Sequence, residues 1–492
     1  MAESAGSASS AFGRVGRRFS FLDALTWGIT AVIGISYFFG ITLGHVFVQD
    51  DFAAYVMHAA NLVEGRPYSA IHYVPNTQAP WVSPANGYPP VYPLLLAPVY
   101  WRLGMDLLAM KIMTVGTFVI FLAACALWVK PLVSSGLRVI VVGLVGLSPA
   151  FWSYRDLISS EFPYLMFSFL ALLAIRRGPS VVQRWPQVGW ALLAALLLYA
   201  CYGTRTIGIA LCGALIAAEL LSLRKPTRFL MLVLGVVAGL VILQSVLLTS
   251  PTGYAAVAHF SVRSMLENAV GYAKSLSHAW ENGFSKAAHV GLTAFWKRIR
   301  EGALEAFYLV IYMAILLAWG AQMGIRGLIP VLPIYLTYVV LGIAETVEAW
   351  RVQRARALVA IVAVCVALSY LGGLRQRAWQ LSMANVNDAS AQELFAFLRA
   401  QTQPSDLLLF SKPRSIALFS ARATASLDAQ ESASESARFL REHEVRFVIQ
   451  TSWNPPSYAQ LLATDGAQFA EVFRNRDFQV FRVHSEVVAA GQ

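Results

Sequence analysis

Two adjacent acids, Asp50 and Asp51, follow the first long apolar run of the chain and are its first candidates for chemistry. That run covers about residues 21–48, so the two carboxyl groups are expected where the chain leaves a membrane. Four residues continue from Asp51 at +4, +8, +11 and +14: Tyr55, Ala59, Leu62 and Gly65. The first three share one helix face, and the glycine suits the C-terminal end. This pattern indicates chemistry at the membrane surface, or else an interfacial helix with solvated acids.

Two further charged residues stand beside apolar runs on the same predicted side of the membrane. Glu161 begins an apolar run near 160–175, and Arg205 lies between two such runs. A guanidinium group matches two phosphate oxygens at once, so Arg205 is a candidate phosphate ligand. Glu161 is a candidate for orienting a substrate. Each has a plain alternative, because an acid at a helix N-terminus meets the helix dipole and an interfacial arginine extends to lipid headgroups.

The residues around Asp51 resemble the first external loop of the GT-C superfamily of polytopic membrane glycosyltransferases. The resemblance rests on Asp51, the helical set that follows it and the tripeptide 88–90 (Tyr-Pro-Pro), all in order within a multispan chain. The superfamily includes protein O-mannosyltransferases (glycosyltransferase family 39) and lipid A aminoarabinose transferases. The resemblance covers roughly residues 45–250 well, the late apolar runs poorly and the C-terminal region hardly at all.

The resemblance implies a donor sugar on a polyprenyl or dolichyl phosphate and an acceptor hydroxyl on a lipid, glycan or protein, with inversion at the anomeric carbon. Asp51 aligns with the catalytic aspartate, and we expect desolvation beside lipid to make it more basic. Asp50 remains the alternative, since many relatives carry the second acid after the catalytic one, whereas Phe52 follows here. Glu161 and Arg205 stand where the family has an acid and a cation.

Five further residues are candidates for contacting substrate: Tyr55, Tyr88, His259, Arg263 and Arg354. Tyr88 replaces a lysine that some aminoarabinose-transferase relatives carry, which counts against that substrate. His259 and Arg263 are one helical turn apart, and a surface position explains them equally well. Arg354, with Arg351, resembles the arginine before a late span, but the expected Tyr and Pro are missing, so an interfacial basic loop is the alternative. No metal or other cofactor is favoured, although oligosaccharyl-transfer relatives use a divalent ion.

The composition indicates a helical membrane protein. Of 492 residues, 57% are hydrophobic and 13% charged, whereas ordinary soluble domains carry about a quarter charged residues. The alternation typical of β-barrels is absent. The net charge of +11 comes from basic residues spread over short gaps between apolar runs, which is an orientation signal, so no nucleic-acid partner is predicted. The four cysteines lie in or beside apolar segments and show no metal or disulfide pattern.

The chain divides into three predicted parts. Residues 1–20 form a disordered cytoplasmic N-terminus, and residues 21–374 form an all-α domain of about ten or eleven spans, with external loops at about 45–107 and 249–302. The candidate residues then collect on the external face, which is the periplasmic face of a bacterial inner membrane. Ten spans put the remaining C-terminal part in the cytoplasm, and an eleventh puts it outside.

Residues 385–492 form the third part, a small α/β domain. We predict helices over 389–401 and 432–443, the latter with a capping box at Ser432 and Glu435. Strands are predicted over 406–410 and 446–450, followed by a hairpin around 475–477.

The favoured function is therefore an integral membrane glycosyltransferase of cell-envelope glycans. The alternative is a transporter or flippase, in which Asp50, Asp51, Glu161 and Arg205 line a pathway. Such charges usually lie near the bilayer midplane, and their position at one rim favours the enzyme. A third alternative is a member of the superfamily that binds lipid phosphate without turnover.

Overall fold

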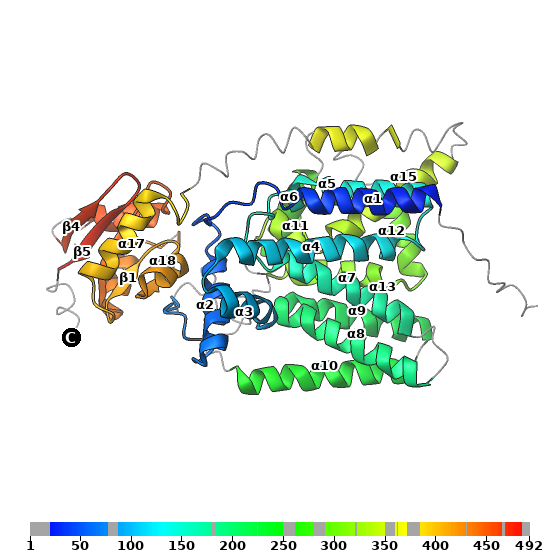
Figure 1. Ribbon diagram of the computed structural model, residues 1–492, viewed down its shortest axis with the longest axis horizontal. Helices are drawn as coiled ribbons and strands as arrows, with labels where there is room; N and C mark the ends of the chain where they lie inside the picture. Colours follow the sequence, from blue (N-terminus) through cyan, green and yellow to red (C-terminus); the bar gives the residue numbers. More distant parts are fainter. Residues whose placement is uncertain are drawn as a thin grey trace, which may run out of the picture.

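The structure is a computed structural model that describes residues 20–76, 87–178, 184–223, 225–248, 261–278, 291–319, 322–349, 360–361, 363–370, 384–429, 431–464 and 468–484. His259, Arg351 and Arg354 fall outside these ranges. A bundle of helices runs along the long axis, and a small domain with strands lies at one end, on the left in Figure 1. The predicted class, a helical multispan membrane protein with a small C-terminal α/β domain, is confirmed.

The helices that form the bundle are α1 (Phe21–Ser36), α4 (Leu107–Val129), α5 (Ser135–Leu147), α7 (Glu161–Arg177), α8 (Arg184–Thr204), α9 (Ile209–Leu223), α10 (Arg228–Leu247), α11 (Val262–His278), α12 (Gly291–Arg300), α13 (Leu304–Leu317) and α15 (Leu332–Ala349). Other helical elements at or near its ends are α2 (Asp51–Glu64), α3 (Val91–Leu103), α6 (Pro149–Trp152), η2 (Thr206–Gly208) and α14 (Ile325–Leu328). Helix α2 ends as predicted at Gly65, whose φ of 67° is left-handed.

Five helical segments among the described residues are long and apolar enough to cross a membrane: Leu107–Val129, Ser135–Trp152, Trp185–Thr204, Arg228–Leu247 and Leu332–Ala349. Three shorter apolar helices accompany them: Phe21–Ser36, Thr206–Leu221 and Leu304–Leu317. Side chains near the end of α10, such as Val246 and Leu247, are about 70% exposed, as expected for a surface that lipid covers.

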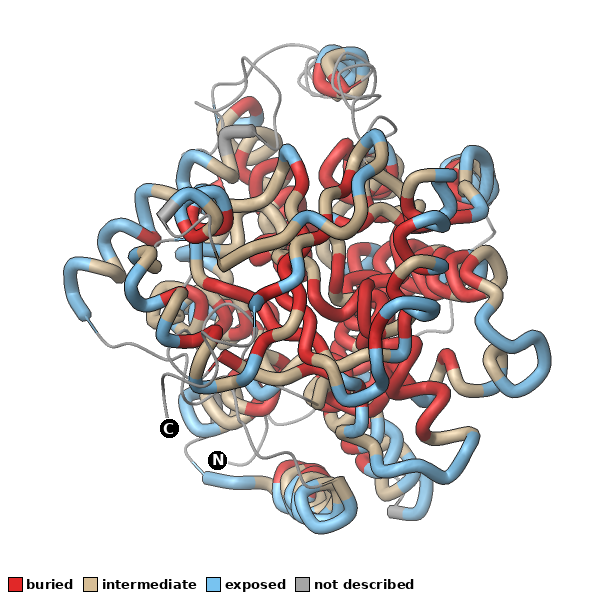
Figure 2. The backbone as a smooth tube through the Cα atoms, turned by 90° about the vertical axis from the view of Figure 1, so that its left-hand side faces the viewer, coloured by how far each residue is buried: buried red, intermediate tan, exposed pale blue. Residues whose placement is uncertain are grey.

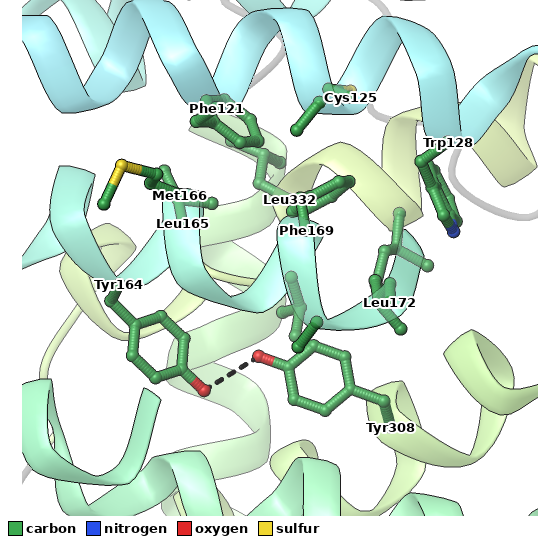
Figure 3. Packing of buried hydrophobic residues seen from close by; sticks show 14 of the residues in the cluster. Phe121, Cys125, Trp128, Tyr164, Leu165, Met166, Phe169, Leu172, Tyr308 and Leu332 are labelled. Carbon is green, nitrogen blue, oxygen red and sulfur yellow. Dashed lines mark hydrogen bonds between the residues drawn. The ribbon is translucent and has the colours of Figure 1, made fainter. Parts of the chain in front are cut away.

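The interior of the bundle is apolar and rich in aromatic side chains. Buried residues concentrate in the middle of the molecule, and exposed ones lie on its outer helices (Figure 2). On α4 and α7, Phe121 and Trp128 both meet Phe169 edge-on, with ring centroids 5.0 and 5.2 Å apart. The hydroxyls of Tyr164 and Tyr308 lie 3.0 Å apart, so each phenol has a polar partner in an apolar setting (Figure 3). This packing holds the N-terminus of α7 in a defined place.

Ion pairs mark the end of the bundle opposite the C-terminal domain. Arg138 of α5 pairs with Asp23 of α1, and Arg298 of α12 donates to Glu305 of α13 at 2.5 Å. Lys297 of α12 also reaches Glu345, near the end of α15, at 2.9 Å. Helix α12 therefore lies at this end.

The segment 249–302 was expected at the same end of the bundle as loop 45–107, but of its two described helices only α11 lies there. Asn268 of α11 donates to the carbonyl of Leu317 at 3.1 Å, so α11 lies where α13 ends, near the C-terminal domain. Helix α12 instead follows α15 to the opposite end (Figure 1). Helix α12 is ten residues long and carries three cations in its last turn. The C-terminal domain lies at the same end of the bundle as α2 (Figure 1), the arrangement expected from the sequence if an eleventh span is present.

The C-terminal domain has a five-stranded sheet of order β2-β1-β3-β5-β4, flanked by helices. Its elements are α17 (Ala389–Gln401), β1 (Leu407–Leu409), α18 (Pro413–Ser420), β2 (Ala423–Ala425), α19 (Ala433–Glu442), β3 (Val445–Gln450), α20 (Pro456–Thr464), β4 (Phe469–Arg474) and β5 (Gln479–Val483). Strands β1, β2 and β3 are parallel, and β4 and β5 form the predicted antiparallel hairpin. The capping box of Ser432 and Glu435 is present. Helices α18 and α20 and strand β2 were not predicted.

The first loop and the C-terminal domain share backbone hydrogen bonds and one core. The amide of Val74 donates to the carbonyl of Thr424 at 2.8 Å, and the amide of Thr424 to the carbonyl of His72 at 2.9 Å. Residues 72–74 thus cover the β2 edge of the sheet, which would otherwise be open. Phe47 is fully buried against aromatic rings of the C-terminal domain, including Phe410. The domain is therefore packed against residues on both sides of α2, Phe47 before it and residues 72–74 after it.

Candidate active site

Asp51 is the first residue of α2 and lies where the bundle meets the C-terminal domain. Its Oδ1 accepts a hydrogen bond of 2.6 Å from the hydroxyl of Tyr88, and its Oδ2 lies 2.7 Å from Nη2 of Arg326. Nη1 of Arg414, from α18, is 3.4 Å from Oδ1. The carboxylate therefore has partners from three separate parts of the chain.

Arg326 joins Asp51 to the second predicted acid. Its Nε donates to Oε1 of Glu161 at 2.6 Å, and the same oxygen accepts a hydrogen bond from Arg205. Glu161 is fully buried, whereas Asp51 and Arg326 keep 22% and 24% of their side chains exposed. The structure thus brings together three residues predicted from the sequence in a continuous ionic chain, Asp51–Arg326–Glu161–Arg205, which we call the ionic chain below.

Arg326 is not among the residues predicted from the sequence. It occupies the short helix α14, just before the apolar helix α15. Its position at the start of an apolar run, like that of Glu161, was the only signal that could have marked it. An arginine there reads equally well as an interfacial residue, so the sequence carries no means of choosing it.

The charges around Asp51 reverse the expectation that desolvation makes it more basic. Burial raises the pKa of Asp51, but the positive charges of Arg326 and Arg414 and the hydrogen bond from Tyr88 together outweigh it. The net result is a pKa well below the usual range of an aspartate. In this conformation Asp51 is ionised, and its proton affinity depends on where the two guanidinium groups are.

Asp50 has a different role from its neighbour. Its Oδ2 accepts from the amide of Arg414 at 3.0 Å, and its Oδ1 accepts from the amide and the hydroxyl of Ser415, each at 2.7 Å. These are the free amides at the N-terminus of α18, where a carboxylate is favourable. Burial raises the pKa of Asp50 despite the nearby Arg414. Asp50 therefore attaches the C-terminal domain to α2, and its carboxylate faces away from the ionic chain.

Arg414 was also missed, because it lies in the C-terminal domain, about 360 residues from Asp51. Its side chain is 4% exposed, and its guanidinium carbon lies 5.0 and 5.1 Å from the ring centres of Tyr73 and Tyr88. Aromatic faces attract cations at such distances, most strongly when water is excluded. Nothing in the local sequence distinguishes this arginine from others in the domain.

Two aromatic residues predicted to contact substrate support the acids. The hydroxyl of Tyr55 donates to Oγ of Ser160, the residue before Glu161, at 3.1 Å. The amide of Tyr88 donates to Nε2 of His58 at 3.2 Å, so Nδ1 of that ring carries the proton and donates to the carbonyl of Tyr68 at 2.7 Å. Burial lowers the pKa of His58 to about 4, so this ring is neutral and holds Tyr88 against Asp51.

The remaining predicted residues do not join the ionic chain in the described part of the protein. Arg263, on α11, is 89% exposed and pairs with Glu267 one turn away at 2.9 Å. This exposed pair is worth little energetically. His259 and Arg354 lie outside the described residues. The same restriction applies to metal ligands, since no cluster of three His, Cys, Asp or Glu side chains is found among the residues that the structure describes.

An apolar cavity of about 670 Å³ opens between α11, α12, α13 and α15. Its lining includes Tyr272, Phe295, Met313, Leu328 and Tyr338. Leu328 belongs to the same short helix as Arg326, so this cavity begins two residues along the chain from the ionic chain. A hydrocarbon group bound in the cavity would therefore lie near Arg326 of the ionic chain.

A scan against models of protein families and a search of curated proteins both find no match. Solved structures do match. The chain is similar to ArnT from Cupriavidus metallidurans in the apo state, with 12% identity, a TM-score of 0.56, and coverage of 94% of this chain and 98% of that one.

Two other similar structures extend this result. The oligosaccharyltransferase of Archaeoglobus fulgidus, solved with Zn and sulfate, has 12% identity and a TM-score of 0.58 over 87% of this chain and 68% of that one. The arabinofuranosyltransferase AftD from Mycobacteria has 13% identity and a TM-score of 0.53, with 94% of this chain and 40% of that one covered. At these identities the likeness shows the fold, which is the GT-C fold expected from the sequence.

Proposed function

We propose that this GT-C-fold membrane protein is a glycosyltransferase that moves a sugar from a polyprenyl-phosphate donor to an acceptor hydroxyl with inversion. One observation carries the proposal: the partly exposed carboxylate of Asp51 is linked through Arg326 to Glu161 and Arg205, near an apolar cavity. Such a donor needs three things, namely a base for the acceptor, cations for the leaving phosphate and a groove for the lipid. The described residues offer all three within one end of the bundle.

The cations in this proposal are Arg326 and Arg205. A guanidinium group can bind two phosphate oxygens at once, and each of these two already has a carboxylate partner that a phosphate can replace. Their charges would be positioned before the reaction, where negative charge develops on the leaving oxygen. Glu161 lies between them, fully buried, and keeps both guanidinium groups in place when no substrate is bound.

The proposed base, Asp51, becomes more basic when the donor binds. In the free protein Arg326 keeps its pKa low. A phosphate that binds Arg326 withdraws that positive charge from Asp51 and adds a negative charge nearby, and both changes raise its pKa. The carboxylate thus takes up a proton most readily when a donor is in place, which limits wasted hydrolysis.

The chemical step is a single displacement. The acceptor oxygen attacks the anomeric carbon from the side opposite the phosphate, and a new C–O bond forms as the bond from carbon to the phosphate oxygen breaks. The hydroxyl proton passes to Asp51, and the bonding electrons leave with the polyprenyl phosphate. Positioning by Tyr88, which donates to Oδ1 at 2.6 Å, leaves Oδ2 to receive the proton once Arg326 turns to the phosphate.

The apolar cavity between α11 and α15 supports a lipid-linked donor. Its volume of about 670 Å³ fits several isoprene units, and it lies beside Leu328, two residues from Arg326. The tail of such a donor already lies in lipid, so the cavity would add packing contacts and fix the position of the donor rather than remove apolar surface from water. The phosphate would then meet Arg326 at the mouth of the cavity.

The charge distribution supports an active site on the periplasmic face of a bacterial inner membrane. The opposite end of the bundle carries basic residues at or near the ends of its helices, and these are Lys130, Arg138, Arg176, Arg177 and Arg298. Basic residues in short loops favour the cytoplasmic side. The N-terminal end of α1 lies there too, since its Asp23 pairs with Arg138.

The proposal is tested with the purified protein in lipid nanodiscs and a panel of synthetic decaprenyl-phosphate-linked hexoses and pentoses, with bacterial envelope extract as acceptor source. Mass spectrometry measures release of decaprenyl phosphate. Release that requires Asp51 supports the transferase. If no sugar is transferred, and the same protein in sealed proteoliposomes instead moves the intact donor to the far leaflet, the protein is a flippase and the proposal fails.

A further inference from the structure

The C-terminal domain reaches the site through one short helix, α18. The first two residues of α18 after Pro413 are Arg414 and Ser415, and both are held by Asp50, the residue before Asp51. The bonds to Asp50 come from two backbone amides and the hydroxyl of Ser415. The bonds to Asp50 therefore do not involve the side chain of Arg414.

The environment of the Arg414 side chain points to the site. The guanidinium group lies between the rings of Tyr73 and Tyr88, with Nη1 directed at Oδ1 of Asp51 at 3.4 Å. Its Nε and Nη2 atoms are buried and have no hydrogen-bond partner among the described residues. Burying a cation with unpaired donors destabilises a protein, so a purely structural role accounts poorly for an arginine here.

We infer that Arg414 is a positioning residue for Asp51, so that the C-terminal domain completes the active site. This inference rests on the proposed function. When the donor phosphate draws Arg326 away, Arg414 and Tyr88 are the partners that still hold Oδ1, and Oδ2 alone is free to accept the proton. The C-terminal domain acts in this way on the orientation and charge of Asp51, while the donor is bound by groups of the membrane domain.

The geometry separates the effects of Arg414 on turnover and on binding. The carboxylate nearest to the guanidinium group of Arg414 is that of Asp51. Among the described residues, the guanidinium group forms no ion pair with Glu161, whose partners are Arg205 and Arg326. Removing the charge should lower kcat by at least about tenfold, because general base catalysis depends on placement. The KM for the donor should stay within about threefold. An opposite charge at this distance shifts a carboxyl pKa by roughly 1 to 3 units, so the acidic limb of the kcat profile should move up by about one pH unit or more.

The experiment compares full-length wild type, Arg414→Met and Arg414→Lys in nanodiscs, with decaprenyl phosphate release from the active synthetic donor as readout between pH 4 and 9. Methionine fills the space between the two tyrosine rings without a charge, and Arg414→Gln replaces it if the methionine variant fails to insert. Arg438→Gln, at an exposed position on α19, is the matched control. Ser415→Ala weakens attachment of the domain but keeps the arginine.

We expect Arg414→Met to show the lower kcat and the shifted acidic limb, Arg414→Lys to restore part of that shift, and Ser415→Ala to lower Tm without moving the limb. A folded neutral variant with the wild-type kcat and pH profile overturns the inference. So does a neutral variant that only loses thermal stability, as Ser415→Ala does. Failure of the proposed function looks different, because the wild type then releases no decaprenyl phosphate at any pH.

Discussion

Removing the charge of Asp51 should lower catalysis, whereas removing the charge of Asp50 should lower thermal stability. Asp51→Asn keeps the shape of the side chain and a hydrogen bond with Tyr88, but the amide cannot take up the acceptor proton. A positioned general base contributes about 10² to 10⁴ in rate. At 1.36 kcal/mol for each factor of ten, this is about 3 to 5 kcal/mol of transition-state stabilisation. We expect Asp51→Asn to lose at least about a hundredfold in kcat while it still folds and inserts.

Asp50→Asn should instead weaken the attachment of the C-terminal domain. The carboxylate accepts three hydrogen bonds from Arg414 and Ser415, and an amide keeps only one oxygen and turns an N–H toward the amide of Arg414. Loss of one such bond to a charged acceptor costs about 1.5 to 3 kcal/mol. The expected outcome is a clearly lower Tm with kcat reduced by less than about tenfold.

Both variants are measured by decaprenyl phosphate release in nanodiscs, with Tm from intrinsic fluorescence on the same samples. The reasoning is refuted if Asp51→Asn retains release within tenfold of the wild type. It is also refuted if Asp50→Asn loses release at an unchanged Tm, since Asp50 would then be the base and its bonds to α18 would be incidental.

Three other perturbations test separate parts of the site. Arg326→Gln should raise the KM for the donor and lower kcat, each by at least about tenfold, because the same guanidinium group binds the phosphate and pairs with Asp51. An unchanged KM would show that Arg326 does not bind the phosphate. His58 has a pKa of about 4 in the folded protein, below its unfolded value of about 6.5, so the folded state binds fewer protons and the free energy of unfolding decreases as pH falls through that window. His58→Gln should make this decrease smaller. Chemical denaturation at pH 7 and pH 5 measures the free energy of unfolding of both proteins. Met313→Trp should fill the apolar cavity and raise the KM for a decaprenyl donor at least about tenfold while sparing a donor whose lipid is replaced by a methyl group, with Ile120→Trp, at a half-exposed position on α4, as control. An unchanged KM for the decaprenyl donor would place the tail elsewhere.

Features that follow from local rules were predictable from the amino-acid sequence. Apolar runs near the thickness of a bilayer required membrane helices, since backbone groups in lipid must be paired within the segment. Helical spacing after Asp51 predicted α2 up to Gly65, and its left-handed glycine is observed. In the C-terminal domain, the Ser432/Glu435 capping box and the final hairpin were likewise readable, because each depends on residues within a few positions of one another.

The roles of the charged residues depend on contacts between distant parts of the chain. Asp50 and Asp51 are neighbours in sequence, yet one holds α18 and the other faces Arg326, because successive residues at a helix start point in different directions. The partners of Asp51 come from positions 37 to 363 residues away, and no local pattern records such separations. Even the direction of the shift in the pKa of Asp51 depended on them. Burial, which the sequence suggested, raises that pKa, and two guanidinium groups that packing brings within 3.4 Å reverse the shift.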